Sequence, residues 1–211
     1  MKLYIIRHGE TDGNKAGYFQ GWTNDPLNEK GRELAVLTGR ALRGVRFDSC
    51  ISSPLDRARE TAEIILRESG NEGTPIGTDD RIKEVRLGDW ERKRFRAGES
   101  EIDEGAVELF FRNPFLLGGF PGGETVREVC ARTQSLLREL LDRDDGKTYL
   151  LATHGFATRA MLNCLYDDPA DFWHGHVPYN CSVSVVEGVR GKGRLVEDDR
   201  IFYTDAVPMG R

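Results

Sequence analysis

The chain has 211 residues, of which 38% are hydrophobic and 31% charged, a balance that fits one α/β domain with a well-solvated surface. Its net charge of −5 argues against general nucleic-acid binding, which requires a basic face, and no apolar stretch has the pattern of a signal peptide or the length of a membrane span. The four cysteines lie far apart without a CxxC pair, so neither a disulfide framework nor a zinc site is predicted, and we expect a cytoplasmic protein.

Strand-like and helix-like segments alternate along the chain, and this alternation predicts a mostly parallel sheet covered by helices. Residues 2–7 are expected to form the first strand, and residues 11–25 a loop over its end. Asn28 can cap a helix that ends near Gly44, and residues 47–51 are predicted to form a second strand.

The pattern continues at Ser53 and Pro54, a capping residue followed by a residue typical of the first helical position. This pair predicts a helix with Arg57 in its first turn. Residues 92–123 are expected to form a lid or insertion within a single domain that spans residues 1–211. The other predicted elements are helices at 102–111, 124–141 and 157–165, a strand at 149–153, and an edge hairpin of strands at 182–187 and 194–197.

Two of the histidines follow buried strands in the same way. Arg7 and His8 end the first apolar run, and His154 ends the run over residues 149–153. If these strands are parallel neighbours, both imidazoles lie at the carboxyl edge of one sheet, where open α/β sheets bind ligands. Arg57 comes just after the end of the second strand, so the same edge is predicted to hold two guanidinium groups.

This set of cations and imidazoles favours phosphoryl transfer. The planar fork of arginine suits phosphate oxygens, and the first amides of the helix after Ser53 add donors for an anion. Cations beside an imidazole disfavour its protonated form, so one ring nitrogen can attack phosphorus at neutral pH and form a phosphohistidine. The arginines and the second imidazole would hold the equatorial oxygens of the transferred group without a metal.

The same residues stand in motifs that resemble those of the histidine phosphatase superfamily, the phosphoglycerate mutase-like family. The motifs occur in order along nearly the whole chain: Arg7-His8-Gly9-Glu10-Thr11 with Asn14, Gln20-Gly21-Trp22, Ser52-Ser53-Pro54 through Arg57 to Ala62, Glu84 before Gly88-Asp89-Trp90-Glu91, Gly122-Gly123-Glu124-Thr125, Thr153-His154-Gly155, and Asn180-Cys181-Ser182-Val183. The resemblance implies a three-layer α/β/α sandwich with a mostly parallel central sheet.

The resemblance also assigns roles to residues. It makes His8 the phosphorylated nucleophile and Glu84 the proton donor to the leaving oxygen, while Arg7, Arg57 and His154 would complete the phosphate pocket. The lesser phosphate contacts that it implies are Asn14, Gln20, Gly21 and Gly155. No cofactor or metal is implied. The expected partner is a small phosphorylated substrate rather than nucleic acid or a membrane, and a homodimer is left open.

The segment after Glu91 departs from the family pattern. Arg92 stands where the family commonly has a glycine, and three more basic residues follow at Lys93, Arg94 and Arg96. A run of like charges is usually a solvated loop. The sharper hypothesis is a cationic lid that favours substrates with a second anionic group.

Comparison with the cofactor-dependent phosphoglycerate mutases of the family favours a phosphatase. Those mutases generally have a basic tail, whereas residues 203–211 are not lysine-rich, and Glu84 is followed here by Val-Arg-Leu-Gly instead of Arg-His-Tyr-Gly. We therefore expect a metal-independent phosphomonoester hydrolase that acts on small metabolites through a phosphohistidine, with 2,3-bisphosphoglycerate-dependent mutase as the alternative.

Two hypotheses from other classes remain open. Alternate histidines at His174 and His176, near aspartates at 167, 168 and 171, could form a metal site. A non-catalytic module that binds a phosphorylated ligand could also use an arginine-rich pocket. The presence of both His8 and Glu84 argues against such a module, because a binder needs neither a nucleophile nor an acid.

Overall fold

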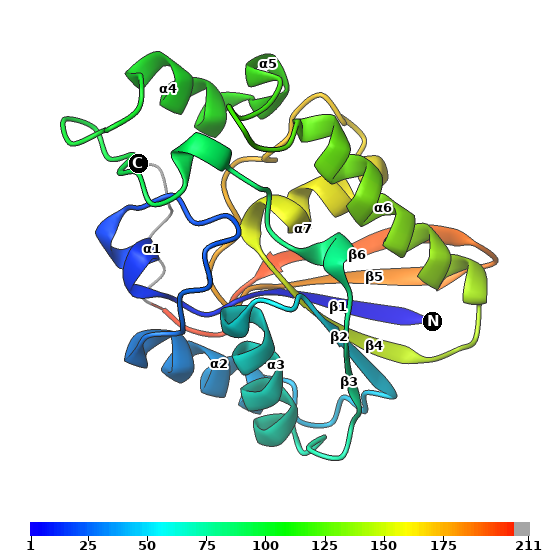
Figure 1. Ribbon diagram of the computed structural model, residues 1–211. Helices are drawn as coiled ribbons and strands as arrows, with labels where there is room; N and C mark the ends of the chain where they lie inside the picture. Colours follow the sequence, from blue (N-terminus) through cyan, green and yellow to red (C-terminus); the bar gives the residue numbers. More distant parts are fainter. Residues whose placement is uncertain (205–211) are drawn as a thin grey trace.

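The computed structural model describes residues 1–204, which fold around a six-stranded sheet with the strand order β3–β2–β4–β1–β5–β6 (Figure 1). The strands are β1 (Lys2–Arg7), β2 (Ser49–Ser52), β3 (Ile76–Thr78), β4 (Thr148–Thr153), β5 (Val183–Val189) and β6 (Lys192–Arg200). Strands β1 to β4 pair in parallel, whereas β5 is antiparallel to β1 and β6 is antiparallel to β5. The sheet is therefore mostly parallel, as the sequence predicts.

Helices cover both faces of the sheet and complete the three-layer α/β/α sandwich (Figure 1). One face carries α2 (Glu29–Ala41) and α3 (Asp56–Ser69), and the other carries α6 (Val126–Arg143) and α7 (Gly155–Leu162). The shorter helices are α1 (Asp12–Ala16), α4 (Glu104–Arg112) and α5 (Pro114–Leu117), with 3-10 turns at Asp80–Ile82, Gly88–Trp90 and Asn163–Leu165. Within residues 1–204, no helix has both the length and the apolar character needed to cross a membrane.

The central strands are apolar on both sides, which explains why helices cover both faces. In β1, Leu3 and Ile5 pack into a cluster with residues of α6 and α7, whereas Ile6 packs with residues of α2 and α3. Strand β4 also contributes to both clusters: Leu151 packs with residues of α6 and α7, and Leu150 packs with residues of α2 and α3. Because successive side chains of a strand point to opposite faces, each strand contributes to two cores.

The structure confirms the strands predicted at 2–7 and 149–153, and it corrects the start of α3. This helix begins at Asp56 after Leu55, not at Pro54, and its first turn has no side-chain cap. The Ser53 hydroxyl, expected to be the cap, instead accepts from the backbone N–H of Leu55 at 3.3 Å and lies 2.8 Å from Nε2 of His154. The short elements β3, α1 and α5 were not predicted, since segments of three to five residues show no readable period.

The predicted lid segment, residues 92–123, packs onto the rest of the chain through aromatic rings. Phe110 of α4 lies with its ring centroid 4.9 Å from that of Phe19, 5.9 Å from that of Phe156 in α7, and 5.4 Å from that of Trp173. These rings belong to one buried cluster that also includes Phe95, Phe120 and Phe172. The segment therefore shares an apolar core with α7 and the loops beside it.

Candidate active site

Two neighbouring parallel strands bring the histidines to one edge of the sheet. Strand β1 pairs with β4 so that Arg7 lies opposite Thr153, and the next residues along the two strands are His8 and His154. The two imidazole rings meet edge to face, with centroids 5.1 Å apart and planes inclined by 60°. The predicted meeting of these two side chains is confirmed.

Hydrogen bonding fixes which nitrogen of His8 carries the proton. Its Nδ1 lies 2.7 Å from the carbonyl oxygen of Gly9, and a carbonyl only accepts, so Nδ1 is the protonated nitrogen. In the neutral ring the lone pair is then on Nε2. Burial, followed by the guanidinium groups of Arg57 and Arg7, holds the pKa of His8 well below its ordinary value, so the ring is neutral at pH 7.

Arg57 is the second residue of α3 and is fully buried. Its Nη1 donates to the carbonyl of Thr23 at 2.5 Å, and its Nη2 donates to the carbonyl of Gly21 at 2.7 Å. In the part of the chain that the structure describes, its Nε has no hydrogen-bond partner. Burial lowers the pKa of Arg57 to about 10, which leaves the guanidinium charged at neutral pH. An anion would satisfy such a buried donor.

His154 has a similar buried nitrogen. Its Nε2 lies 2.8 Å from the hydroxyl oxygen of Ser53, whereas its Nδ1 is buried without a hydrogen-bond partner among residues 1–204. Burial, followed by Arg57 and His8, holds the pKa of His154 well below its ordinary value. When Ser53 donates its hydroxyl proton to Nε2, the neutral ring presents an N–H at Nδ1, which is the form that suits an anion.

Glu84 reaches the same edge of the sheet from the segment between β3 and α4. Its carboxylate accepts hydrogen bonds from the backbone N–H groups of Val85 at 2.9 Å, Phe156 at 3.2 Å and Ala157 at 3.0 Å. Burial nevertheless raises the pKa of Glu84, against the effect of these hydrogen bonds and of Arg57. The carboxyl group therefore keeps its proton to a higher pH than an exposed glutamate does.

An arginine that the sequence analysis missed holds the backbone of this segment. Arg132 of α6 donates to the carbonyl oxygens of Arg81 at 2.8 Å, Lys83 at 2.7 Å and Glu84 at 2.9 Å. Its guanidinium also pairs with the carboxylate of Glu124 at 2.8 Å. The sequence did indicate the position of Arg132, because it lies three positions after the buried Val129 and therefore on the apolar side of this helix.

A pocket opens at this edge between α1, α4 and α7. The predicted site residues in its wall are Arg7, His8, Asn14, Gln20, Glu84 and Gly155. Arg57 and His154 are absent from the wall as described and lie fully buried next to His8. Gly21 also lies outside the described wall, and its N–H donates to the carboxylate of Glu91 at 3.1 Å, so a contact between Gly21 and phosphate stays a prediction.

The model of the histidine phosphatase superfamily (branch 1) matches residues 3–198 of the chain. The chain belongs to the histidine phosphatase superfamily. It is an enzyme of this group and is similar to the probable phosphoglycerate mutase GpmB of Salmonella choleraesuis (strain SC-B67), with 30% identity over 187 residues that cover 89% of this chain and 85% of the relative.

Solved structures support the same assignment. Bacillus stearothermophilus YhfR superposes with a TM-score of 0.83 at 32% identity, covering 95% of this chain and 97% of that chain. The mycobacterial glucosyl-3-phosphoglycerate phosphatase Rv2419c, in complex with VO3, has a TM-score of 0.75 at 27% identity, covering 92% and 96%. The superfamily thus accounts for both the fold and the order of the motifs.

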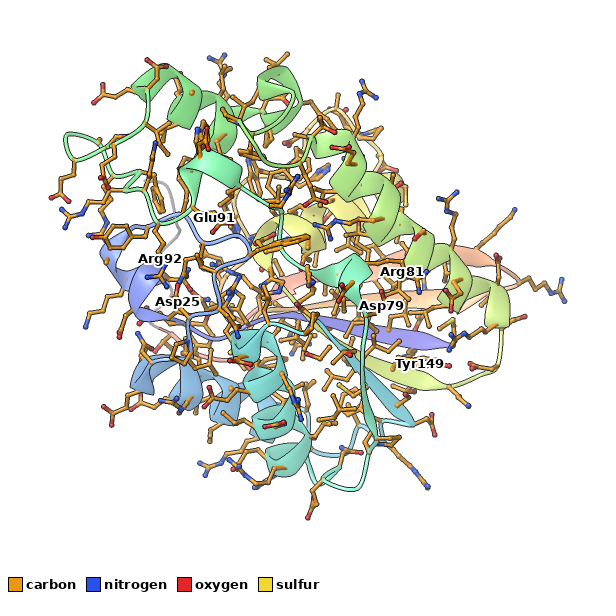
Figure 2. The ribbon with its side chains drawn as sticks, in the orientation of Figure 1. Asp25, Asp79, Arg81, Glu91, Arg92 and Tyr149 are labelled. Carbon is orange, nitrogen blue, oxygen red and sulfur yellow. The ribbon has the colours of Figure 1, made fainter. Side chains whose placement is uncertain are left out.

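In this member of the superfamily, the side chain of Gln20 is held by its neighbours. Its Oε1 accepts from the Thr11 hydroxyl at 2.6 Å and from Nδ2 of Asn14 at 3.0 Å, while its Nε2 donates to Asp25 at 2.7 Å. Asp25 also pairs with Arg92 at 2.8 Å (Figure 2). Contacts of Gln20 and Asn14 with a substrate stay a prediction, but both amides already stabilise the pocket wall.

Glu91, labelled in Figure 2, stands in one of the motifs but was given no role from the sequence. Its carboxylate accepts from the backbone N–H groups of Gly21 at 3.1 Å and Trp22 at 2.8 Å. The carbonyls of Gly21 and Thr23 in turn accept from Arg57, so Glu91 positions this arginine through the loop. A Cβ at Gly21 would lie 2.4 Å from the backbone oxygen of Val85, which cannot move aside as a side chain can, so only glycine fits there.

Replacing Glu91 with glutamine should lower kcat/KM about 10- to 100-fold, because an NH2 group cannot accept from the loop and the guanidinium of Arg57 loses its fixed position. Inhibition by inorganic phosphate should weaken in parallel, an effect that a general loss of stability would not produce. The control is Asp89→Asn, which changes a nearby exposed carboxylate outside the pocket wall. An unchanged inhibition constant for phosphate in Glu91→Gln would remove Glu91 as a positioning residue.

Three of the four basic residues at 92–96 have partners within the chain, which argues against the cationic-lid hypothesis. The guanidinium of Arg94 lies 5.4 Å from the ring centroid of Tyr18 and pairs with Glu99 at 3.4 Å, and Arg96 donates to a backbone carbonyl of α1. The described pocket wall includes none of the four basic residues Arg92, Lys93, Arg94 and Arg96. The charges of Arg92, Arg94 and Arg96 are therefore already engaged within the chain.

Arg92 has a left-handed backbone conformation, with φ of 61°, at the position where the superfamily commonly has a glycine. Arg92→Gly should therefore be more stable than Arg92→Ala by about 1 kcal/mol, since both lose the ion pair with Asp25 but only alanine keeps the strain. Urea unfolding measures the difference. The control is the same pair of changes at Arg59, an exposed residue within helix α3. There the alanine variant should be the more stable one, because glycine weakens a helix interior by about 1 kcal/mol. Equal stabilities of the two Arg92 variants would contradict the strain.

The metal site considered at His174 and His176 is not formed. The ring of His174 stacks on that of Tyr166 with centroids 3.5 Å apart, and Nδ1 of His176 lies 3.3 Å from a carboxylate oxygen of Asp199. Among the residues that the structure describes, no three His, Cys, Asp or Glu side chains gather closely enough to hold a metal ion. The hypothesis based on these two histidines is therefore wrong.

Proposed function

We propose that this enzyme hydrolyses phosphate monoesters of small metabolites through a phosphohistidine formed at Nε2 of His8. The observation that carries the proposal is that His8 and the buried carboxyl group of Glu84 line the same pocket. The imidazole of His8 is neutral, and its hydrogen bond to Gly9 leaves the lone pair on Nε2. A nucleophile and an acid in the same pocket allow the reaction to proceed in two steps. Arg7 and Arg57 supply the positive charge that the transferred phosphoryl group needs, so the scheme includes no metal.

In the first step, Nε2 of His8 attacks phosphorus and the bond from phosphorus to the ester oxygen breaks. Protonated Glu84 gives its proton to the leaving oxygen, so the alcohol departs uncharged. In the second step, the carboxylate of Glu84 takes a proton from water, the water oxygen attacks phosphorus, and the bond to His8 breaks. Inorganic phosphate is released, and both side chains return to their starting protonation states.

The pocket wall favours a phosphatase over a mutase. Phosphoglycerate carries a carboxylate beside its phosphate, and a mutase must also retain a bisphosphate, so cations are needed beyond the phosphate site. Among the described residues of the wall, Arg7 is the only cation. The names of relatives include both activities, a probable mutase in GpmB and a phosphatase in Rv2419c. The tail comparison that favoured a phosphatase falls mainly on residues 205–211, outside the described residues.

A non-catalytic phospholigand module is a weaker alternative. Glu84 lies buried in the wall beside Arg7 and His8 with a raised pKa, and a module that only binds a phosphorylated ligand has no use for such an acid. A catalyst, in contrast, needs an acid next to the leaving oxygen. The electrostatics of Glu84 therefore support turnover.

The test is phosphate release from a substrate panel in buffer with a chelator. The panel contains 4-nitrophenyl phosphate, sugar phosphates, and 3-phosphoglycerate with and without 2,3-bisphosphoglycerate. Release of inorganic phosphate supports the hydrolase. Conversion of 3- to 2-phosphoglycerate that depends on the bisphosphate, with little free phosphate, would assign a mutase instead. Binding of these compounds without any product would assign the non-catalytic module.

A further inference from the structure

Beyond the phosphate end, the pocket is bounded by aromatic rings. Six of them, here called the aromatic wall, come from α4, α7 and nearby loops: Phe19, Phe95, Phe110, Phe111, Phe156 and Trp173. The rings form one packed unit, because the centroid of Phe110 lies 4.9 Å from both Phe19 and Phe111. The pocket is partly open to solvent, so a ligand held at the phosphate end can extend outward along these rings.

Three arginines near the aromatic wall, Arg92, Arg94 and Arg96, already have partners within the chain. The hydroxyl of Tyr18, which also lines the pocket, accepts a hydrogen bond from Arg94 at 3.1 Å, and Arg94 is held there by Glu99 as well. Arg92 pairs with Asp25 at 2.8 Å. A second anionic group on a ligand would therefore lose its hydration at the wall, where Arg7 at the phosphate end is the one cation among the described lining residues, and this loss is unfavourable.

We propose that the substrate's alcohol part is an uncharged, ring-bearing group that packs against the aromatic wall, and that carboxylated and bisphosphorylated substrates are disfavoured. The inference takes its reaction from the proposed hydrolase function, but its ligand class depends on the wall alone. Phe111 is the contact that can be tested, because it is half-buried at the wall and stacks on Phe19 with an interplanar angle of 17°. A flat apolar group that covers this ring gains from buried apolar area and from ring-to-ring contact.

The first experiment compares kcat/KM for benzyl phosphate, glycerol 3-phosphate and 3-phosphoglycerate, all of which release an alkyl alcohol. Benzyl phosphate should exceed 3-phosphoglycerate by about 100-fold. Phe111→Ala should lower the value for benzyl phosphate about tenfold and leave that for glycerol 3-phosphate unchanged. The matched control is Phe115→Ala, which removes a ring that packs on Phe172 outside the pocket wall and should not change the selectivity.

A second variant and a binding measurement separate this proposal from the hydrolase function. Phe111→Arg adds a cation to the wall and should raise kcat/KM for 3-phosphoglycerate while lowering it for benzyl phosphate. Calorimetry with the wild-type protein compares benzylphosphonate with 3-phosphonopropionate, two ligands that cannot be hydrolysed, and benzylphosphonate should bind more tightly.

These measurements distinguish failure of the ligand-class proposal from failure of the hydrolase function. Turnover of all three esters with similar kcat/KM would overturn the aromatic-wall proposal and leave the hydrolase standing. Tighter binding of benzylphosphonate without turnover of any ester would support the ligand class and reject the hydrolase. Equal binding of the two phosphonates, with or without turnover, would overturn the proposed ligand class.

Discussion

Replacing His8 with alanine should abolish phosphate release, lowering kcat by about 10⁴-fold or more, because no Nε2 lone pair remains to attack phosphorus. The variant should also fail to retain radioactive phosphate from a labelled ester when the reaction is stopped in alkaline denaturant, which preserves bonds between phosphorus and nitrogen. The hydrogen bond that the change removes joins His8 only to the adjacent Gly9, so the variant should fold.

The matched control is His174→Ala, which removes an imidazole that stacks on Tyr166 outside the pocket wall. This variant should keep both turnover and labelling. Phosphate that is still trapped on His8→Ala protein would transfer the role of nucleophile to another residue, with His154 the first to examine because its ring lies beside that of His8. Wild-type protein that turns over substrate without ever being labelled would contradict a covalent intermediate.

The central fold could be predicted because its elements have strong local patterns. Strands β1 and β4 are continuous apolar runs, as buried parallel strands are, and α6 carries an apolar stripe at helical spacing. Strand β3 could not be predicted, since it has three residues and the last two are exposed. Its pairing with β2, in which Ile76 lies opposite Cys50, depends on a neighbour that is distant in the chain.

The site could be predicted where a residue follows a strand and not where it acts through a distant partner. His8 and His154 follow β1 and β4 directly, so topology alone brings them together. Arg92 pairs with Asp25, 67 positions earlier, and in the sequence this charge looks like part of a solvated run. The aromatic wall was missed for the same reason, since each ring looks like an ordinary core residue within its own segment.

Replacing Glu84 with glutamine should lower turnover of benzyl phosphate about 10²- to 10⁴-fold, because the poor leaving oxygen needs a proton that glutamine cannot give. Formation of the phosphohistidine from 4-nitrophenyl phosphate should change much less, since nitrophenolate leaves without a proton. The second step also needs the Glu84 carboxylate, so this ester should give a burst of nitrophenol followed by slow turnover. The variant should trap labelled phosphate on His8, which a misfolded protein would not do.

The matched control for this change is Asp80→Asn, which neutralises an exposed carboxylate four positions earlier that pairs with Lys83 outside the pocket wall. This variant should leave the turnover of both benzyl and 4-nitrophenyl phosphate unchanged. Equal losses for benzyl and 4-nitrophenyl phosphate in the first step of Glu84→Gln would show that Glu84 does not protonate the leaving oxygen.

The pH profile tests the same assignment, because kcat/KM requires His8 without its Nε2 proton and Glu84 with its carboxyl proton. Burial and two arginines hold the pKa of His8 well below its ordinary value, so the acid limb should lie well below the pH of an ordinary histidine titration. Burial raises the pKa of Glu84, so activity should fall only as the pH rises through that raised value. For benzyl phosphate, Glu84→Gln should abolish this alkaline limb and keep the acid limb. An alkaline limb that persists unchanged in the variant would have to come from another group, and the proton donor would then not be Glu84.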